Sequence, residues 1–263
     1  MPELPEVETV VRSISGHLVG KRIVNARFSS NRVTRGDHAA TGTALIGATI
    51  TDIERRGKQI WICLDRGFLY VHLGMTGKLL WNGKPGKYTR ASLDFDDGTL
   101  LFDDIRTFGR FEFFGAKENA LGRVGPDALT VSAQEFLSRL KERRGRIKAV
   151  LLSQSFLAGV GNIYADEALF AARIHPRAMA GRLSEARSRR LHSEMVKILS
   201  EAIRHKGSSI SDYVDGFGER GSFQQLHKVY GQTGKPCPSC GTEIRRIVVG
   251  QRGTHYCPRC QRV

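Results

Sequence analysis

The chain has 263 residues, of which 40% are hydrophobic and 25% charged, as is typical of a soluble globular protein with one large or two ordinary domains. It has no apolar run long enough to span a bilayer and no basic N-terminal segment leading into an apolar one. We therefore expect that the protein neither spans a membrane nor is secreted, and that it lies in the cytoplasm.

The net charge of +15 is uneven along the chain. Residues 1–129 carry 18 basic and 15 acidic side chains, whereas residues 130–263 carry 23 and 11. A basic excess concentrated in one half predicts a polyanionic partner. Nucleic acid is favoured over an anionic membrane, because the sequence has no basic helix with a strongly hydrophobic face.

The first predicted element is a helix from Pro5 to about residue 18, where Val7, Val10, Val11, Ile14 and Leu18 follow a helical period. Pro5 suits the first position of a helix, and Glu3 and Glu6 would lie near its positive end. The same stretch allows a second interpretation. If Met1 is removed, Pro2 has a free secondary amine, which can attack an aldehyde-like carbon and become a cationic iminium.

Short β-branched or aromatic runs follow, separated by turn residues. Asp65-Arg66-Gly67 and Asp96-Asp97-Gly98-Thr99 are typical of hairpin turns. This spacing predicts an antiparallel β-sandwich preceded by one helix, ending near residue 128. The predicted strands are Arg22–Phe28, Thr49–Arg55, Gln59–Leu64, Phe68–Leu73, Gly77–Trp81, Ser92–Phe95, Thr99–Phe102 and Arg110–Phe114.

Beyond this first domain (1–128) the hydrophobic period becomes helical and predicts a second domain over 129–228. Ser132 and Glu135 form a capping-box pattern. Asn162 follows a Gly-Val-Gly turn at the expected cap of a later helix, where backbone N–H groups can bind an anion. Segment 207–225 has little periodicity and is expected to be a functional or mobile loop. The predicted helices span 132–144, 147–154, 163–172 and 184–205.

The last predicted domain, 229–263, contains a C-x2-C-x16-C-x2-C pattern. Two tight pairs of thiolates match tetrahedral zinc, and the 16 residues between them can form a hairpin. Two disulfides would be rare in an internal protein. We therefore expect one structural Zn²⁺ in a β-ribbon whose arginines face a phosphate backbone. Its ligands are Cys237, Cys240, Cys257 and Cys260.

Five motifs together resemble the bacterial formamidopyrimidine-DNA glycosylase family, of the helix-two-turn-helix superfamily, over essentially the whole chain. They occur in the order Pro2-Glu3-Leu4-Pro5-Glu6, Gly57-Lys58, the run 72–77, the run 159–165 and the cysteine ribbon. The resemblance implies an α+β multidomain fold. In this fold an N-terminal helix and an antiparallel β-sandwich precede a helical helix-two-turn-helix domain with a C-terminal zinc β-ribbon.

The resemblance also implies a bifunctional enzyme. It would excise 8-oxoguanine and formamidopyrimidines from damaged double-stranded DNA and then cut the strand by β,δ-elimination. Pro2 would be the nucleophile that attacks C1′, Glu3 the acid and Glu6 a supporting carboxylate. Lys58 and Arg252 would contact phosphates and assist elimination. We expect a monomer with no nucleotide cofactor and no membrane partner.

A flipped base leaves a hole in the DNA stack. The resemblance assigns Met75, Arg106 and Phe108 to fill it. Further DNA contacts carried over from the family are His72, Arg90, Arg143, Lys148, Asn162 and Tyr230. The chain departs from the family at Tyr88-Thr89-Arg90, where relatives have two histidines around a threonine, although Arg90 can still contact phosphate. Loop 207–225 matches in character the segment that closes over 8-oxoguanine, with candidate base contacts at Ser208, Ser209 and Tyr213.

Two alternatives have distinct sequence signatures. A sister glycosylase for oxidised pyrimidines typically carries Gly where this chain has Leu4, which favours purines. A non-catalytic DNA-binding zinc protein would have no use for the combination of Pro2, Glu3 and Lys58.

Overall fold

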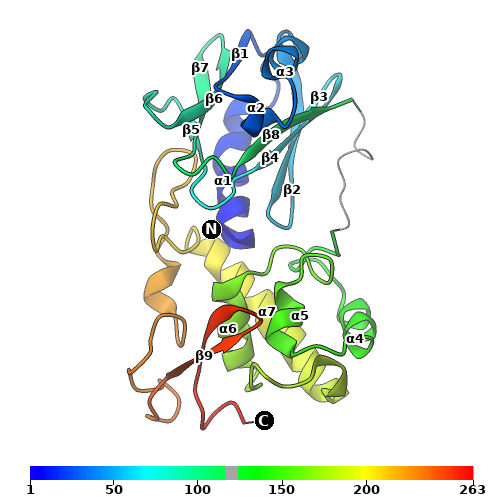
Figure 1. Ribbon diagram of the computed structural model, residues 1–263, viewed down its shortest axis with the longest axis vertical. Helices are drawn as coiled ribbons and strands as arrows, with labels where there is room; N and C mark the ends of the chain where they lie inside the picture. The colour runs from blue at the N-terminus through cyan, green and yellow to red at the C-terminus, as the bar shows by residue number, and fades with distance from the viewer. Residues whose placement is uncertain (116–123, 263) are drawn as a thin grey trace. The chain divides into compact units, whose positions relative to one another are not determined.

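The computed structural model describes residues 1–115 and 124–262, and the chain forms two compact units (Figure 1). The first comprises Met1–Gly122 and His205–Gln224; the second comprises Arg123–Arg204 and Gln225–Val263. Segment 205–224 therefore belongs to the N-terminal unit, although the second unit flanks it in sequence. The three domain ranges inferred from the sequence stay a prediction. Among the described residues, no helix has the length and apolar character needed to cross a bilayer.

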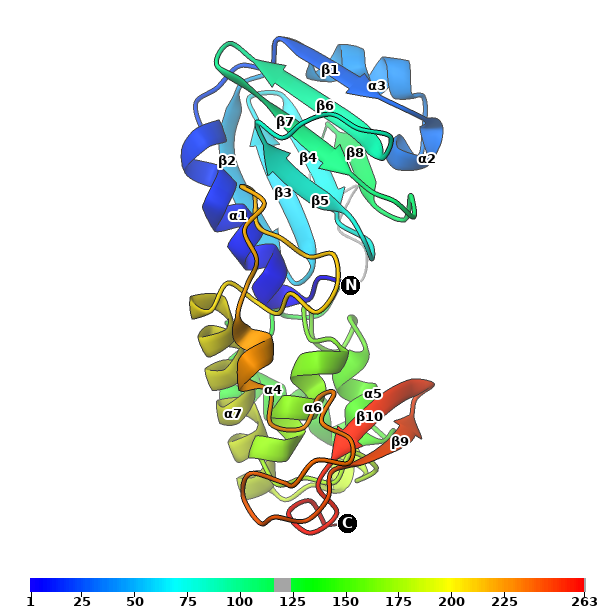
Figure 2. The same cartoon turned by 90° about the vertical axis from the view of Figure 1, so that its left-hand side faces the viewer.

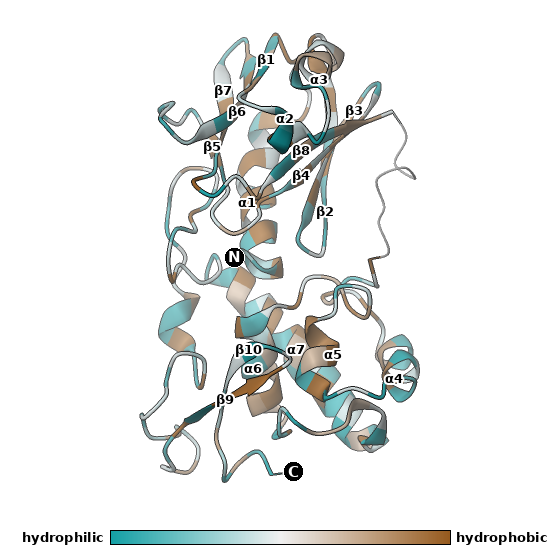
Figure 3. Cartoon of the chain, viewed as in Figure 1, coloured by the Kyte–Doolittle hydropathy of each residue, from teal (hydrophilic) through white to brown (hydrophobic). Residues whose placement is uncertain are grey.

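The first unit begins with α1 (Leu4–Leu18), as predicted. Pro5 lies in its first turn, where a missing N–H costs nothing. Hydrophobic and hydrophilic residues alternate along this helix (Figure 3), and its buried face includes Val7, Val10 and Ile14. Each such side chain contributes about 1.5–3 kcal/mol on burial. The helix is thus anchored to the core through one face.

Two four-stranded antiparallel sheets form the rest of this core, with orders β1-β6-β7-β5 and β2-β3-β4-β8. Figure 2 shows the sheets with α1 beside β2. The predicted turns are confirmed: residues 65–66 and 96–97 join their hairpins directly. The strands are β1 (Asn25–Phe28), β2 (Ile50–Arg56), β3 (Gln59–Leu64), β4 (Gly67–His72), β5 (Lys78–Trp81), β6 (Thr89–Phe95), β7 (Gly98–Asp103) and β8 (Arg110–Phe114).

Two short helices were not predicted, α2 (Asn31–Thr34) and α3 (His38–Leu45). Asp37 caps α3 by accepting hydrogen bonds from the N–H groups of Ala39 and Ala40, at 2.9 and 3.3 Å. The eight residues of α3 include small and polar ones without a clear apolar stripe, so periodicity gave no signal there.

The second unit contains the predicted helices and the predicted ribbon. Ser132 Oγ accepts the Glu135 N–H at 3.1 Å, which confirms that cap. The expected cap at Asn162 is wrong: Gly161 is the N-cap and Asn162 is the first helical residue. The elements are α4 (Ala133–Lys141), α5 (Ile147–Leu152), α6 (Asn162–Ala171), the 3-10 turn η2 (Ala180–Arg182), α7 (Glu185–Arg204), β9 (Arg245–Val249) and β10 (Arg252–Tyr256). The 3-10 turn η3 (Phe223–Leu226) spans the change from the first unit to the second in sequence.

Candidate active site and nucleic-acid interface

The start of α1 holds two buried carboxylates next to Pro2. Pro2 is buried, while Met1 is 50% exposed. Glu6 Oε2 accepts the Glu3 N–H and Glu6 Oε1 accepts the Ser208 N–H, both at 2.8 Å. A carboxylate buried to this extent requires such donors. With Met1 in place the Pro2 nitrogen is an amide, and only removal of Met1 makes it a secondary amine.

The turn between β2 and β3 carries Lys58 and is linked to α1 through Arg55. Gly57 adopts φ +59°, and Lys58 is only 8% exposed. Arg55 fixes this turn: it pairs with Glu8 Oε2 of α1 at 2.5 Å and donates to Gly57 O at 3.0 Å. Burial alone would raise the pKa of Glu8. Hydrogen bonds and charges from Arg55 and Arg12 outweigh this effect, so the pKa lies below its usual value and the carboxylate stays ionised. The structure thus brings the predicted lysine to the end of α1 that carries the N-terminal residues.

His72 lies at the end of β4 and is neutral at pH 7. Burial, together with the charges of Arg110 and Lys58, lowers its pKa to about 4. Its Nδ1 accepts the Gly74 N–H at 3.0 Å, which leaves the ring proton on Nε2. His72 therefore offers no positive charge to a phosphate, and the predicted contact could be made only as a neutral N–H donor.

The residues predicted to fill the hole in the stack lie on two adjoining loops of the first unit. Met75 and Phe108 are 40% and 54% exposed, and the Arg106 guanidinium lies 4.8 Å from the centre of the Phe108 ring. The loops are in close contact at Gly74, where a Cβ would come within 2.7 Å of Phe108 C. Two exposed apolar side chains on adjoining loops are of the kind that can be inserted between bases.

Asp104 connects these loops and was not singled out from the sequence. It is 1% exposed. Its Oδ1 accepts hydrogen bonds from the Thr76 hydroxyl at 2.5 Å and the Arg106 N–H at 3.2 Å, while Oδ2 accepts the Gly109 N–H at 2.8 Å. Arg90 Nε donates to Asp104 O at 2.9 Å, which places the predicted Arg90 at the same loops.

In the second unit, α5, α6 and the β9–β10 hairpin hold three predicted DNA contacts together. Asn162 Nδ2 and Lys148 Nζ both donate to Gly253 O, each at 3.1 Å. Arg252 directly precedes this residue and is exposed. The hairpin tip is therefore tied to two helices at the residue next to its candidate phosphate contact.

Lys148 is completely buried and forms an ion pair with Asp166 Oδ1 at 2.6 Å. Asp166 Oδ2 also accepts the His255 N–H at 2.8 Å and lies 3.1 Å from its Nδ1. Losing one member of a buried pair is strongly destabilising, because the other charge is left alone. Lys148 therefore supports the hairpin in this structure, and its contact with DNA stays a prediction.

Tyr230 and Arg143 take different places in the second unit. The Tyr230 ring packs edge-on against His255 at 5.0 Å, and its N–H is one of three backbone donors to the buried Glu167. Tyr230 therefore lies beside the supported hairpin. The Arg143 guanidinium instead lies 5.5 Å from the ring of Phe156. The DNA contacts of both residues stay predictions.

The four predicted zinc ligands converge. The sulfurs of Cys237, Cys240, Cys257 and Cys260 all lie within 4.8 Å of one another. Backbone N–H groups of Ser239 and Cys260 point at ligand sulfurs at 3.4 Å. Four thiolates without an open position fit a structural metal site, most plainly zinc. The ion would hold the end of the ribbon together, with no chemical role.

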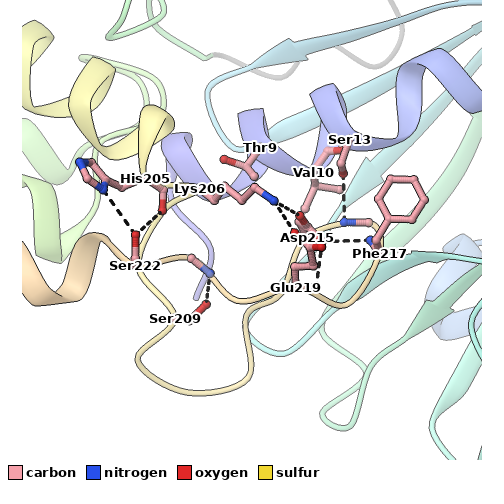
Figure 4. A network of polar contacts seen from close by, with 12 residues as sticks. Thr9, Val10, Ser13, His205, Lys206, Ser209, Asp215, Phe217, Glu219 and Ser222 are labelled. Atoms are coloured by element: carbon pink, nitrogen blue, oxygen red, sulfur yellow. Dashed lines mark hydrogen bonds and ion pairs between the residues drawn. The ribbon is translucent and has the colours of Figure 1, made fainter.

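Segment 205–224 packs on α1 and is held by hydrogen bonds and ion pairs between its own residues (Figure 4). Ser13 Oγ of α1 accepts the Gly216 N–H at 3.0 Å. Asp215 Oδ1 accepts the N–H groups of Phe217 and Glu219, and Lys206 pairs with both acids. The predicted loop therefore has a defined conformation in this structure.

The candidate base contacts in this segment are turned into the protein. Ser208 and Ser209 are 5% and 3% exposed. Ser209 Oγ donates to Tyr213 O at 2.9 Å, and the Tyr213 hydroxyl donates to Glu6 O at 3.3 Å. Ile210, which the sequence did not single out, is 53% exposed. The Ser209 side chain thus bonds within the segment, and the Tyr213 side chain attaches the segment to α1.

The acids that position the site were missed from the sequence for one reason: each is buried. Asp104 follows another Asp at the end of β7, and Asp166 adjoins Glu167 inside α6, where every residue from 163 to 170 is buried. Two adjacent acids within an otherwise apolar helix are a usable signal, since charged residues are almost never fully buried unless paired.

Comparison with known proteins covers nearly the whole chain. Residues 1–111 match the formamidopyrimidine-DNA glycosylase N-terminal domain, and residues 124–214 match the H2TH domain of the same glycosylase. Residues 234–263 match a zinc finger found in this glycosylase and in IleRS. The formamidopyrimidine-DNA glycosylase of Solibacter usitatus is 51% identical, over 100% of both chains.

Solved structures of the same glycosylase are also similar to this chain. A Lactococcus lactis Fpg variant in complex with Fapy-dG-containing DNA superposes with a TM-score of 0.92, at 36% identity and with 100% of both chains covered. A second complex, of the wild-type Lactococcus lactis protein with DNA containing an oxidised pyrimidine, superposes with a TM-score of 0.91 at the same identity and coverage.

Proposed function

The chain belongs to the formamidopyrimidine-DNA glycosylase family and is a DNA glycosylase for damaged DNA, and from this premise we propose that it excises oxidised purines and then cleaves the strand through Pro2. The substrates are 8-oxoguanine and ring-opened formamidopyrimidines in duplex DNA. The observation that carries the proposal is the buried position of Pro2 next to the buried Glu3–Glu6 pair, where removal of Met1 would leave a secondary amine.

In the proposed reaction the Pro2 nitrogen attacks C1′ as the damaged base leaves. A free α-amine has a pKa of about 8, so part of the population is unprotonated at neutral pH. Glu3 supplies a proton to the sugar oxygen as the ring opens, and the product is an iminium between Pro2 and the sugar. The iminium withdraws electrons and acidifies the C2′ proton.

Loss of the C2′ proton then expels the 3′ phosphate by β-elimination, and a δ-elimination expels the 5′ phosphate. Lys58 is held at the end of α1 that carries Pro2, which supports a part in these proton transfers. Arg252 at the supported hairpin tip is an exposed cation suited to a phosphate. Met75, Arg106 and Phe108 fill the gap left by the flipped base.

Oxidised pyrimidines are the second candidate substrate, because a relative was solved with DNA containing such a lesion. Excision from matched duplexes that contain 8-oxoguanine or thymine glycol tests the choice. We expect the purine lesion to give the higher single-turnover rate. A higher rate on thymine glycol would overturn the purine assignment, and binding without release of either base would favour a non-catalytic DNA-binding protein.

A further inference from the structure

A basic hollow of about 550 Å³ lies beside the cysteine cluster of the second unit. Arg173, Arg187, Arg259 and Arg262 line it together with Ser239 and two of the cysteines. None of these described lining residues is acidic, aliphatic or aromatic. Pockets for drug-sized molecules are mostly apolar, so this lining does not suit one. Converging guanidinium groups instead suit a phosphate, which each can bind through paired N–H donors.

Within the described residues 124–262 the four arginines have no acidic partner, and none of their guanidinium groups forms an ion pair or a side-chain hydrogen bond. Other arginines of the same unit do have partners: Arg189 pairs with Glu185 at 2.7 Å, and Arg139 with Glu135 at 3.8 Å. Cations gathered without counter-charges repel one another and oppose folding. Stability alone therefore gives no reason for the cluster.

Two local explanations leave most of this charge unaccounted for. Arg173 follows the C-terminal end of α6, whose negative end favours a cation, but Arg187 lies in the first turns of α7, whose positive end does not. Four thiolates with one Zn²⁺ carry a net charge of −2. Set against four guanidinium groups, that centre still leaves an excess of about two positive charges.

The hollow lies at the other end of the second unit's elements from the predicted phosphate contacts. Asn162 opens α6 and Arg173 follows its end, about 15 Å away at 1.5 Å per residue. Arg252 opens β10, and the cysteine cluster follows its end, again roughly 15 Å away. The two elements are joined at both ends: Asn162 donates to Gly253 O, and Gln261 Nε2 donates to Ile174 O at 2.9 Å.

We propose that this hollow binds backbone phosphates of a second DNA segment, apart from the segment held at Arg252 and Asn162. The proposal rests on the proposed function only in taking duplex DNA as the polyanion that the protein meets. Its chemistry is independent of sequence and of any lesion, because guanidinium groups contact phosphates and no base-reading group lines the hollow.

The test counts undamaged duplexes bound to the full chain. Analytical ultracentrifugation would use a labelled duplex of about 12 base pairs, roughly 40 Å long, at about 50 mM salt. We expect two duplexes per wild-type protein and one per R173Q/R187Q/R259Q/R262Q variant. The matched control, R177Q/R182Q/R190Q/K197Q, loses as much charge from exposed positions of the same unit that do not line the hollow, and should still bind two.

Other results overturn the proposal. Binding of only one duplex per wild-type protein would refute the second DNA segment. An acidic protein segment would then be tested as the ligand of the hollow. Equal losses in both variants would assign the second duplex to net charge alone. Zinc content is measured in each protein, and if the fourfold variant loses metal, R173Q/R187Q, outside the cysteine motifs, takes its place in the same comparison.

Excision of 8-oxoguanine from a short duplex is measured alongside. It should be unchanged in the fourfold variant, and a loss would place the hollow within the lesion complex and refute a separate segment. If the wild-type protein excised nothing, the proposed function would fail while the duplex count could still be read.

Discussion

Gly207 lies in segment 205–224 against the buried carboxylate of Glu6. It adopts φ +76°, and a Cβ there would lie 2.7 Å from Glu6 Oε1. In Gly207→Ala, the left-handed backbone costs about 1–2 kcal/mol. The clash also forces the Glu6 carboxylate away from the Ser208 N–H, and a hydrogen bond to a charged group contributes about 1.5–3 kcal/mol. We expect a total destabilisation of about 2.5–5 kcal/mol.

Gly218→Ala is the matched control within the same segment. Gly218 adopts φ +82°, but a Cβ there meets no atom within 4 Å. It should cost only the backbone term, about 1–2 kcal/mol. Urea unfolding of both variants measures the difference, and hydrogen exchange at the Ser208 amide reports the contact itself. Equal destabilisation, with unchanged exchange at Ser208, would show that Glu6 does not hold the segment.

Three further predictions concern Asp104, the buried His72 and the metal site. Asp104→Ala removes one hydrogen bond to the loop of Thr76 and two within its own loop, and single-turnover excision should fall at least tenfold while DNA binding weakens less. Unchanged excision would show that Asp104 does not position these loops. Because the pKa of His72 is lowered to about 4, the unfolded chain takes up its proton first as the pH falls. Stability present above pH 6.5 should therefore decline between pH 6.5 and about 4, by up to roughly 3 kcal/mol, and His72→Gln should flatten that decline. A wild-type profile no steeper than that of His72→Gln would contradict the burial argument. Chelation of the metal should abolish DNA binding while circular dichroism shows the sandwich still folded; melting of the sandwich with metal loss would contradict independent units.

Local patterns predicted most of the fold because its elements carry strong periodic signals. The buried face of α1 and the continuous apolar runs of β3 and β4 are set by the burial of particular side chains, and two-residue turns join the hairpins. The short α2 and α3 lack such a stripe and were missed. The cap of α6 was placed one residue too late, at Asn162, since Gly161 serves as N-cap without any side-chain signal.

The sequence predicted which residues form the site, but not the contacts that hold those residues in place. Pro2, Glu3 and Lys58 can be identified by motif, but the contact between Glu6 and Ser208 joins positions 202 residues apart. No local pattern encodes such a contact. The adjacent acids of α6 are a local signal that Asp166 is buried, but its partners Lys148 and His255 come from other elements and could not be read from the sequence.

The central claim is that the Pro2 nitrogen becomes covalently joined to the sugar of the damaged nucleoside. Borohydride reduction during reaction with an 8-oxoguanine duplex tests this most directly, followed by mass spectrometry of the proteolysed adduct. We expect one protein–DNA adduct, on the N-terminal peptide that begins at Pro2 after loss of Met1. A protein that retains Met1 should give none. An adduct on Lys58, or no adduct from a protein that releases the base and cuts the strand, would contradict it.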